Sequence, residues 1–445
     1  MRWMCRTCWA RCAANTKGMP SALDALCAPC GLGETGAFVL VGKRKAVWRG
    51  MASQGYEIRL FDKRIASFTF ETNCFGESCA VGLRVEPGAE ELLPLNLVGC
   101  SNDIELRRFL DSRRIPKNRA YVERILAPFG LQASDTKGIV DVTKGMSIND
   151  SYCVVPADED SCFAEYNLFG NSFDTVLSII AYTGRIPSSQ VGFGIPSELS
   201  PSGSFPKTWR VVNGQRVLYK AAHADGLGLE PVSEYLASQV AVAMGLLHVA
   251  YDLDVWQERL CSTCVLMNDA EISFVPFAHM LDRDAKDGMN LERALAFFDE
   301  LGEEAGQRFR SMLVFDAVIM NPDRHMGNYG VFRDNHTGRV LGFAPIFDNN
   351  LALLPQYDTE ALTEEFLRER FAATPGAFGP TAYQQARAAL GPQQQEQLER
   401  LHGFAFDDAA LMRVSGQTDG FAFPKQRLLA LGQAVRENAA ALLKV

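Results

Sequence analysis

Three side chains with the chemistry needed for phosphoryl transfer follow one another late in the chain. Asp323 and Asn328 are five residues apart in the polar loop Met320–Asn328, and Asp348 ends the short apolar run Pro345–Phe347. Phosphoryl transfer needs one carboxylate to orient the attacking hydroxyl. It also needs an amide and a second carboxylate to hold the metal ions that neutralise the nucleotide phosphates. The pattern predicts that Asp323 is catalytic and that Asn328 and Asp348 bind Mg²⁺.

The segments beside this loop have patterns that would position it. Phe309–Met320 carries apolar residues at helical spacing, whereas Tyr329–Phe332 and Val340–Phe347 are typical of strands. The residues between the two strands are a turn of Asn, Asp and Gly. Because all of these are common turn residues, an isolated D-x-x-x-x-N is also compatible with an ordinary turn. The interpretation therefore depends on an upstream nucleotide-binding half.

An upstream strand and helix have the properties of such a half. Gln215–Ala222 alternates apolar and polar residues and carries Lys220. The next segment, Glu230–Gly245, has Pro in its first turn and Gly at its end, as a helix would. We expect Glu234 to face the lysine strand and to form an ion pair that fixes Lys220 near the phosphates. The alternative is a surface lysine and a solvated glutamate.

A loop of small residues precedes this strand and helix. In Leu199–Trp209, Gly203 and Ser204 present little side-chain bulk, so their backbone N–H groups are expected to approach phosphate oxygens of ATP. The loop is not a Walker motif, since no G-x-x-x-x-G-K-[ST] occurs there. Taken alone, it is also compatible with an ordinary Ser/Pro turn.

In this order the motifs resemble those of the HipA-type bacterial serine/threonine kinases, the toxin halves of some toxin–antitoxin pairs. The resemblance covers roughly residues 170–445. It implies a two-lobed protein-kinase-like α+β fold with a small mixed β lobe, a large mostly helical lobe and an accessory N-terminal module. It also implies ATP and Mg²⁺ as cofactors, a protein substrate and a small helix-turn-helix antitoxin as partner. The matching residues are Ser200, Gly203 and Lys207 of the phosphate loop, Lys220, Glu234, Asp323, Asn328 and Asp348.

The chain departs from the family pattern at two places. Phe205 stands where the family usually has Gln, and Asp348 is followed by two Asn residues without the Gly of D-F-G. The D-R-H-x-x-N loop also resembles that of phosphoinositide kinases, so a lipid or small-molecule kinase is an alternative. A further alternative is a kinase-like module that binds nucleotide or an antitoxin without chemistry. The family resemblance also implies that Ser200 is a site of self-inactivating phosphorylation.

Composition is that of a soluble globular protein. The 445 residues are 47% hydrophobic and 22% charged, with a net charge of −9, which disfavours non-specific nucleic-acid binding. The positive cluster between Arg107 and Arg119 is interpreted as a solvated helix face. No apolar run reaches the roughly 18 residues of a membrane span, and no secretory signal is evident, so a cytoplasmic location is expected.

Five of the twelve cysteines lie in the first thirty residues. Cys5-x-x-Cys8 and Cys27-x-x-Cys30 have the spacing of a four-thiolate zinc site. Because a start-like Met51 precedes the first well-patterned strand, residues 1–50 are alternatively an extension that is not a native domain. Cys261 and Cys264 are interpreted as buried small residues between strands of the small lobe.

Four parts are expected along the chain: an extension at 1–50, an accessory α+β module at 51–165, a kinase-like N-lobe at 166–280 and a helical C-lobe at 281–445. In the accessory module, Tyr56–Phe70 is predicted to be a hairpin, Leu95–Val98 a strand, and Asn102–Arg113 and Ala120–Ala127 helices. A packing role for these helices is favoured over DNA reading, because their linker holds Pro and the chain is acidic.

Overall fold

The computed structural model describes residues 53–72, 77–99, 102–187, 194–199, 203–223, 226–281, 283–417 and 421–444. Cys5, Cys8, Cys27, Cys30 and Ser200 lie outside these ranges, and so do the predictions of a zinc site and of self-phosphorylation. Residues Arg49–Val445 form one compact unit. No helix among the described residues is long and apolar enough to cross a bilayer.

The accessory module is a four-stranded antiparallel sheet covered by short helices. The sheet order is β3-β2-β1-β4, and α1 packs on β3 while α3 packs on β4. Alternating side chains of the predicted hairpin, such as Ile58 and Phe68, are buried against Leu106 and Phe109 of α1. The bounds are β1 (Ser53–Leu60), β2 (Lys63–Thr72), β3 (Ser78–Val85), β4 (Tyr152–Pro156), α1 (Asp103–Asp111), α2 (Val122–Leu126), α3 (Thr136–Thr143) and α4 (Phe163–Tyr166).

One predicted strand of this module is wrong. Leu95–Leu97 forms a 3₁₀ turn in which the Leu97 N–H donates to the Pro94 carbonyl. Pro94 has a fixed φ and no N–H group, so the chain enters this segment without a donor for a sheet ladder. The helix expected from Ala120 begins later, at Val122, because Tyr121 takes a left-handed conformation with φ 60°.

The small lobe is a second antiparallel sheet, of order β5-β6-β8-β7, with α6 packed against it. Cys261 and Cys264 are buried as expected, but they lie within β8 and not between strands. Helix α5 packs on β5 at the edge of the sheet. The bounds are α5 (Thr175–Thr183), β5 (Lys207–Val212), β6 (Gln215–Ala221), α6 (Glu230–Met244), β7 (Asp252–Trp256) and β8 (Arg259–Val265).

The large lobe is mostly helical and contains the largest hydrophobic core. Helix α9 lies in this core with nearly every residue from Phe309 to Val318 buried, and α11, α12 and α14 pack around it. A three-stranded sheet, of order β11-β10-β9, connects this helical core to the rest of the protein. The bounds are β9 (Ile272–Pro276), α7 (Arg283–Asp287), α8 (Leu291–Glu300), α9 (Glu303–Val318), β10 (Gly330–Asp334), β11 (Val340–Phe343), α10 (Glu364–Ala373), α11 (Ala382–Ala389), α12 (Pro392–Glu399), α13 (Ala409–Val414) and α14 (Lys425–Leu443).

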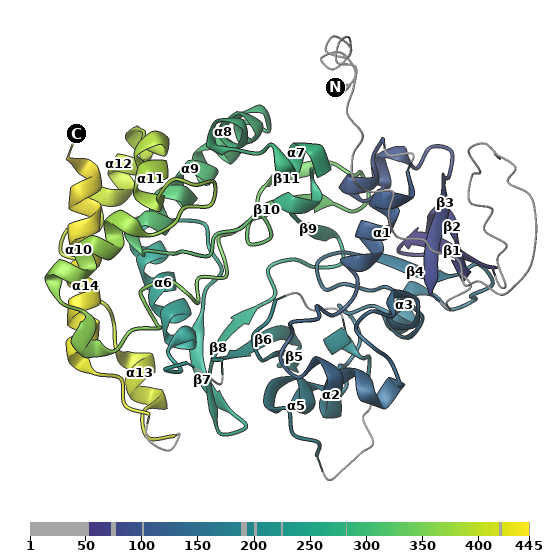
Figure 1. The fold of residues 1–445 in the computed structure, drawn as a ribbon, viewed down its shortest axis with the longest axis horizontal. Coiled ribbons are helices and arrows are strands. Elements are labelled where there is room, and N and C mark those ends of the chain that lie inside the picture. The colour runs from purple at the N-terminus through teal and green to yellow at the C-terminus, as the bar shows by residue number, and fades with distance from the viewer. Residues whose placement is uncertain are drawn as a thin grey trace, which may run out of the picture. The chain divides into compact units, whose positions relative to one another are not determined.

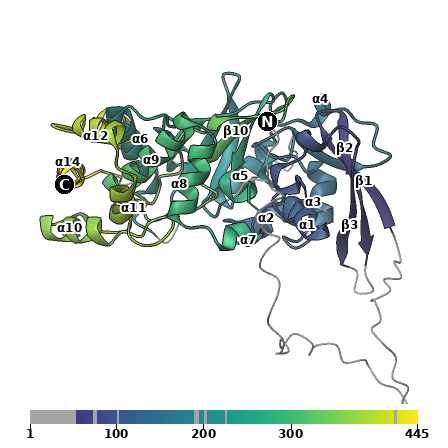
Figure 2. The ribbon, with the colours of Figure 1, turned by 90° about the horizontal axis from the view of Figure 1, so that it is seen from above.

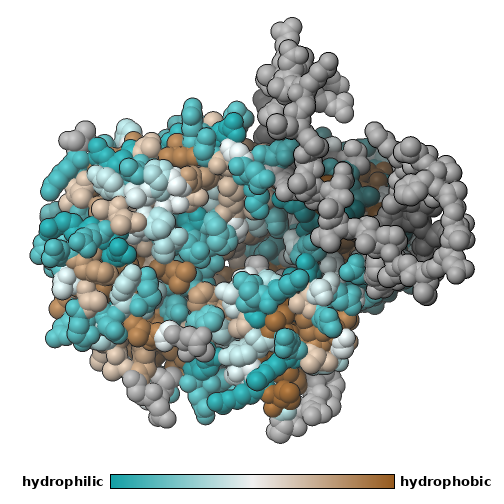
Figure 3. Space-filling model, viewed as in Figure 1, coloured by the Kyte–Doolittle hydropathy of each residue, from teal (hydrophilic) through white to brown (hydrophobic). Residues whose placement is uncertain are grey.

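Within this unit, helices α10 to α14 and the sheet β1 to β3 lie at opposite ends, with the β5 to β8 sheet and β9 to β11 between them (Figures 1 and 2). The fold is therefore α+β, with a small β lobe, a large helical lobe and an accessory N-terminal module, as expected. Large exposed apolar side chains, for example Ile186, Val242 and Leu429, come from separate segments of the chain. In Figure 3, hydrophobic residues (brown) are interspersed with hydrophilic ones (teal) across the visible face.

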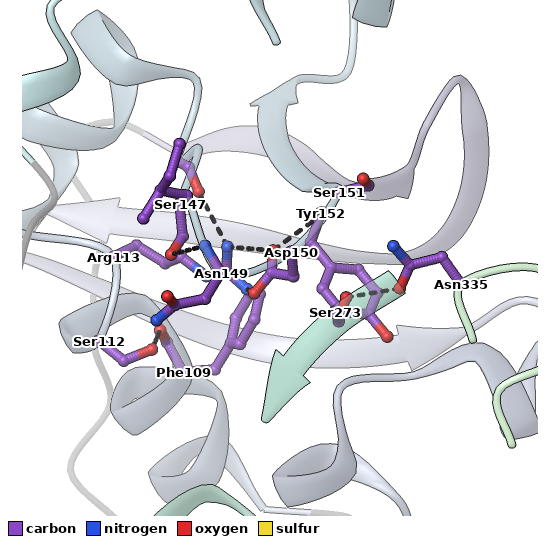
Figure 4. A network of polar contacts seen from close by, with 12 residues as sticks. Phe109, Ser112, Arg113, Ser147, Asn149, Asp150, Ser151, Tyr152, Ser273 and Asn335 are labelled. Atoms are coloured by element: carbon purple, nitrogen blue, oxygen red, sulfur yellow. Dashed lines mark hydrogen bonds and ion pairs between the residues drawn. The ribbon is translucent and has the colours of Figure 1, made fainter. Parts of the chain in front are cut away.

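A polar network joins the accessory module to the large-lobe sheet (Figure 4). Arg113 donates two hydrogen bonds of 2.8 Å to Asp150, whose Oδ1 also accepts from the Tyr152 N–H. Next to it, the Asn149 carbonyl accepts from the N–H of Phe274 on β9. The expectation of a solvated basic face is wrong for Arg113 and Arg119, which are only 3% and 2% exposed, whereas Arg107 and Lys117 are exposed. Acceptors far along the chain bind the Nη atoms of both buried guanidinium groups and offset part of the cost of burial.

Candidate active site

Lys220 lies on β6, which has hydrogen-bonded neighbours on both sides. In register with it are Ser262 of β8 and Lys207 of β5. Two lysines directly opposite each other on neighbouring strands repel, so this pair costs stability unless anionic groups lie beside it. The sheet therefore places two lysines side by side in the wall of a cavity.

The Lys220 amine bridges two carboxylates. Its Nζ lies 3.3 Å from Glu234 Oε1 on α6 and 2.5 Å from Asp348 Oδ1. Glu234 is held in turn by Ser262, whose hydroxyl donates to Oε2 at 2.7 Å. Helix α6 begins with Pro231 in its first turn and ends at Gly245 with φ 72°, and its buried face contains Glu234. The predicted Lys220–Glu234 ion pair is thus present in the structure.

The charges in this cluster shift one another's pKa. Burial alone would lower the pKa of Lys220, but the neighbouring Asp348 and Glu234 raise it. Burial would raise the pKa of Asp348, but the Lys220 ammonium outweighs it and lowers this pKa to about 2. Burial raises the pKa of Glu234, and Lys220 opposes that rise only in part. Lys220 and Asp348 are therefore both charged at neutral pH.

The loop after α9 is fixed by one buried arginine. Arg324 donates to both oxygens of Asp316, with its Nε 2.9 Å from Oδ2 and its Nη2 2.9 Å from Oδ1. Its Nη1 donates to the carbonyls of Asn328 at 3.1 Å and Phe347 at 2.6 Å. Since Phe347 directly precedes Asp348, Arg324 joins the loop that carries Asp323 to the segment that carries the second carboxylate. The position of Arg324 in the D-R-H-x-x-N motif did not predict this role.

Asp323 and Asn328 face the same cavity as Asp348. The Asn328 side-chain amide donates to the Asp323 carbonyl at 3.1 Å, which leaves the Asn328 Oδ1 for other partners. No hydrogen bond to the Asp323 carboxylate is found within the described ranges. Burial raises the pKa of Asp323, with Asp348 adding to the rise and His325 opposing it. A raised pKa favours proton acceptance, which suits a general base.

The described part of the predicted phosphate loop begins at Gly203 and lies close to the amines of both Lys207 and Lys220. Gly203 has φ 85°, and a Cβ there would come 2.6 Å from the Lys207 Nζ. The Phe205 ring, which stands where the family usually has Gln, lies 5.5 Å from the Lys220 Nζ. Burial, together with the nearby Arg119 and Lys220, lowers the pKa of Lys207 to about 7. No salt bridge to Lys207 is found among the described residues, so its amine is available to an anion.

The two lysines, Glu234, Asp323, Asn328, Asp348 and the loop residues Gly203 to Phe205 line one cavity of about 580 Å³. This volume is within the usual range of small-molecule sites, roughly 300–1,000 Å³. Two asparagines of its wall, Asn268 and Asn350, each have a buried side-chain atom without a hydrogen-bond partner, namely Oδ1 and Nδ2. A polar ligand in the cavity would supply hydrogen-bond partners for these two atoms. The accessory module closes one side of the cavity with Ser112, Arg114 to Asn118, and Ser147 to Asn149.

The structure brings together every described residue of the predicted site. Gly203, Ser204, Lys207, Lys220, Glu234, Asp323, Asn328 and Asp348 all line the cavity. Residues that sequence reasoning missed are Arg324, Ser262 and Arg119, together with Tyr251, whose hydroxyl accepts from the Asp348 N–H at 3.2 Å. Only Arg324 had a local signal, its place between Asp323 and His325 in the loop motif.

No protein-family model and no curated protein matches the chain. Among solved structures, HipA of Shewanella oneidensis MR-1, solved with HipB and operator DNA, matches with a TM-score of 0.49 and 12% identity, covering 88% of this chain and 99% of that one. The Helicobacter pylori proinflammatory kinase CtkA matches with a TM-score of 0.45 and 18% identity, covering 55% of this chain and 91% of that one.

Proposed function

We propose that the protein is an ATP-dependent phosphotransferase that moves the γ-phosphoryl group of ATP to a hydroxyl. The observation that supports this most directly is the Lys220 amine, bound between Glu234 and Asp348 in a cavity that Asp323 and Asn328 also line. A protein that only bound nucleotide would have no need for a carboxylate with a raised pKa beside the phosphate-binding cations.

The donor set fits Mg²⁺. Asp348 is ionised, and the Asn328 amide and Asp348 carboxylate supply the oxygen ligands that Mg²⁺ prefers. The described residues hold no cluster of three or more His, Cys, Asp or Glu side chains suited to a metal. Two protein ligands suffice for Mg²⁺, because it usually binds through one or two side chains together with substrate phosphates and water. When bound, the ion would neutralise charge on the phosphates.

In this mechanism each side chain has one task. Lys220 and Lys207 bind the phosphates, and Glu234 keeps the Lys220 amine in place. Asp323 orients the acceptor hydroxyl and takes its proton. The bond between the γ-phosphorus and the bridging oxygen breaks, a bond from the acceptor oxygen to the same phosphorus forms, and ADP leaves.

The test is transfer of radiolabelled phosphate from ATP by the full chain, with and without Mg²⁺. The critical variant is Asp323→Asn, which keeps the shape of the side chain and removes its basicity. Asp358→Asn is a matched control, because Asp358 is exposed and does not line the cavity. Mg²⁺-dependent transfer that the first variant loses and the second keeps supports the proposal. Nucleotide binding without transfer in the wild type would instead support a non-catalytic module.

The acceptor classes give different products in the same assay. We propose a protein serine or threonine, as in the family that the chain resembles, and label would then appear in protein. Label in a phosphoinositide or a small molecule would support the alternative kinase class. The predicted phosphorylation of Ser200 is read from intact mass after incubation with Mg-ATP. The predicted antitoxin is sought as a small helix-turn-helix protein encoded beside this chain, tested by co-purification.

A further inference from the structure

One side chain of the accessory module, Arg119, binds the backbone of the phosphate loop in the proposed nucleotide site. This arginine follows α1 in the segment Ile115–Ala120, part of which lines the cavity. Its Nη1 donates to the Phe205 carbonyl at 2.5 Å, and its Nη2 donates to the Lys207 carbonyl at 2.6 Å. Next to it, the Ala120 N–H donates to the Ser204 carbonyl at 2.8 Å. Three carbonyls in four consecutive residues of the phosphate loop are thus bound by the accessory module.

Glu198 completes the attachment from the other end of the loop. The Arg119 Nη2 lies 3.4 Å from Glu198 Oε2, and both side chains are fully buried. Glu198 Oε1 accepts from the Thr208 hydroxyl at 2.8 Å and from the Trp209 N–H at 3.1 Å. Glu198 lies just before the loop, and Thr208 and Trp209 just after it. Through Glu198, the ion pair connects the residues before and after the loop to Arg119. Arg119 in turn binds the loop carbonyls of Phe205 and Lys207.

Stability alone does not account for this ion pair. Burial lowers the pKa of Arg119 to about 10 and raises the pKa of Glu198, so at both groups the loss of hydration outweighs the mutual attraction. A buried ion pair of this kind is often no more stable than apolar residues of similar volume. What it supplies is geometry, because a guanidinium fixes several acceptors in one plane.

We infer that Arg119 is a positioning residue of the nucleotide site, which holds the loop from Gly203 to Lys207 over the phosphates, so that nucleotide affinity depends on the accessory module. This inference rests on the proposed function for the identity of the ligand. The position of the loop matters because Lys207 belongs to it and its amine is directly available to an anion. A loop released from Arg119 would move this amine and the N–H groups of Gly203 and Ser204 away from the phosphates.

The test compares two double variants. Arg119→Met with Glu198→Gln removes the ion pair without leaving a buried charge, and Gln keeps an oxygen for Thr208 and Trp209. The matched control is Arg113→Met with Asp150→Asn, which removes another buried ion pair of the same module that lies at the β9 interface and does not touch the loop. Both are made in the full chain.

Two measurements decide the outcome. Without nucleotide, hydrogen exchange of the peptide Gly203–Trp209 is expected to rise in the Arg119 pair and to stay unchanged in the Arg113 pair. With Mg-ATP, the Arg119 pair is expected to bind about tenfold more weakly and to raise KM more than it lowers kcat, because lost hydrogen bonds from a charged group are of that size. Equal exchange in both pairs, or unchanged affinity in the Arg119 pair, would overturn the inference. If the wild type binds no ATP, the proposed function fails, while the exchange result still decides whether Arg119 holds the loop.

Discussion

Glu234→Gln gives a sharp test of how the site is organised. The substitution keeps the shape of the side chain and an acceptor for the Ser262 hydroxyl, but it removes the charge that faces Lys220. A hydrogen bond to a charged group contributes about 1.5–3 kcal/mol. Since the Lys220–Glu234 distance of 3.3 Å is longer than the 2.5 Å distance to Asp348, we expect the lower value. At 1.36 kcal/mol for each factor of ten, kcat/KM should fall roughly tenfold.

Stability should change much less than activity in this variant. Burial raises the pKa of Glu234, so a neutral Gln avoids part of a desolvation cost. In the opposite direction, Lys220 loses one of the two carboxylates that raise its pKa, although Asp348 remains. Because the two effects oppose each other, we expect a Tm within about 3 °C of the wild type.

The assay is steady-state transfer from ATP together with thermal unfolding of the same preparations. Glu230→Gln is the matched control, because Glu230 is also buried on α6, one helical turn earlier, and does not line the cavity. An unchanged kcat/KM in the Glu234 variant, or an equal loss in the Glu230 variant, would refute the argument that the ion pair positions the lysine.

Three further predictions concern single residues. Asp323→Asn should lower kcat by about a hundredfold or more with an unchanged Tm, as expected for loss of a general base, and a rate near the wild type would contradict that role. ATP affinity should weaken as pH rises through about 7, because Lys207 loses its proton there, and Lys207→Met should remove that part of the pH dependence; an identical profile in both proteins would contradict it. Arg324→Met should destabilise the protein by about 3 kcal/mol in denaturant unfolding, since it leaves Asp316 buried without its partner; a loss below about 1 kcal/mol would show that the pair does not fix the loop.

The residues that sequence reasoning located belong to elements with strong local patterns. Lys220 sits in an alternating strand, and Glu234 in a helix with Pro at its start and Gly at its end. Asp323 and Asn328 share one short loop, so their proximity follows from the chain itself. The order of these elements was then enough to predict one common cavity, and the structure brings the residues together.

The residues that it missed depend on partners far along the chain. From the sequence, Arg119 and Arg113 are interpreted as part of a solvated basic face, because no pattern in the neighbouring residues indicates that they are buried. Their partners are Glu198, 79 residues later, and Asp150, 37 residues later. Helical periodicity reports which face of a helix is apolar, but it does not report which arginine finds a buried carboxylate. The wrong strand near Leu95 has a different cause, a proline whose missing N–H local hydropathy does not reveal.

The same long-range contacts change which residues belong to the proposed nucleotide site. A kinase-like site built from two lobes alone would draw its walls from β5, β6, α6, the catalytic loop and Asp348. Here the accessory module lines one side of the cavity and binds three carbonyls of the phosphate loop. Because the loop is bound from outside the lobe that contains it, loss of the Arg119 contacts is expected to reach the Lys207 amine without altering a residue of either lobe, whereas loss of the Arg113–Asp150 pair is not.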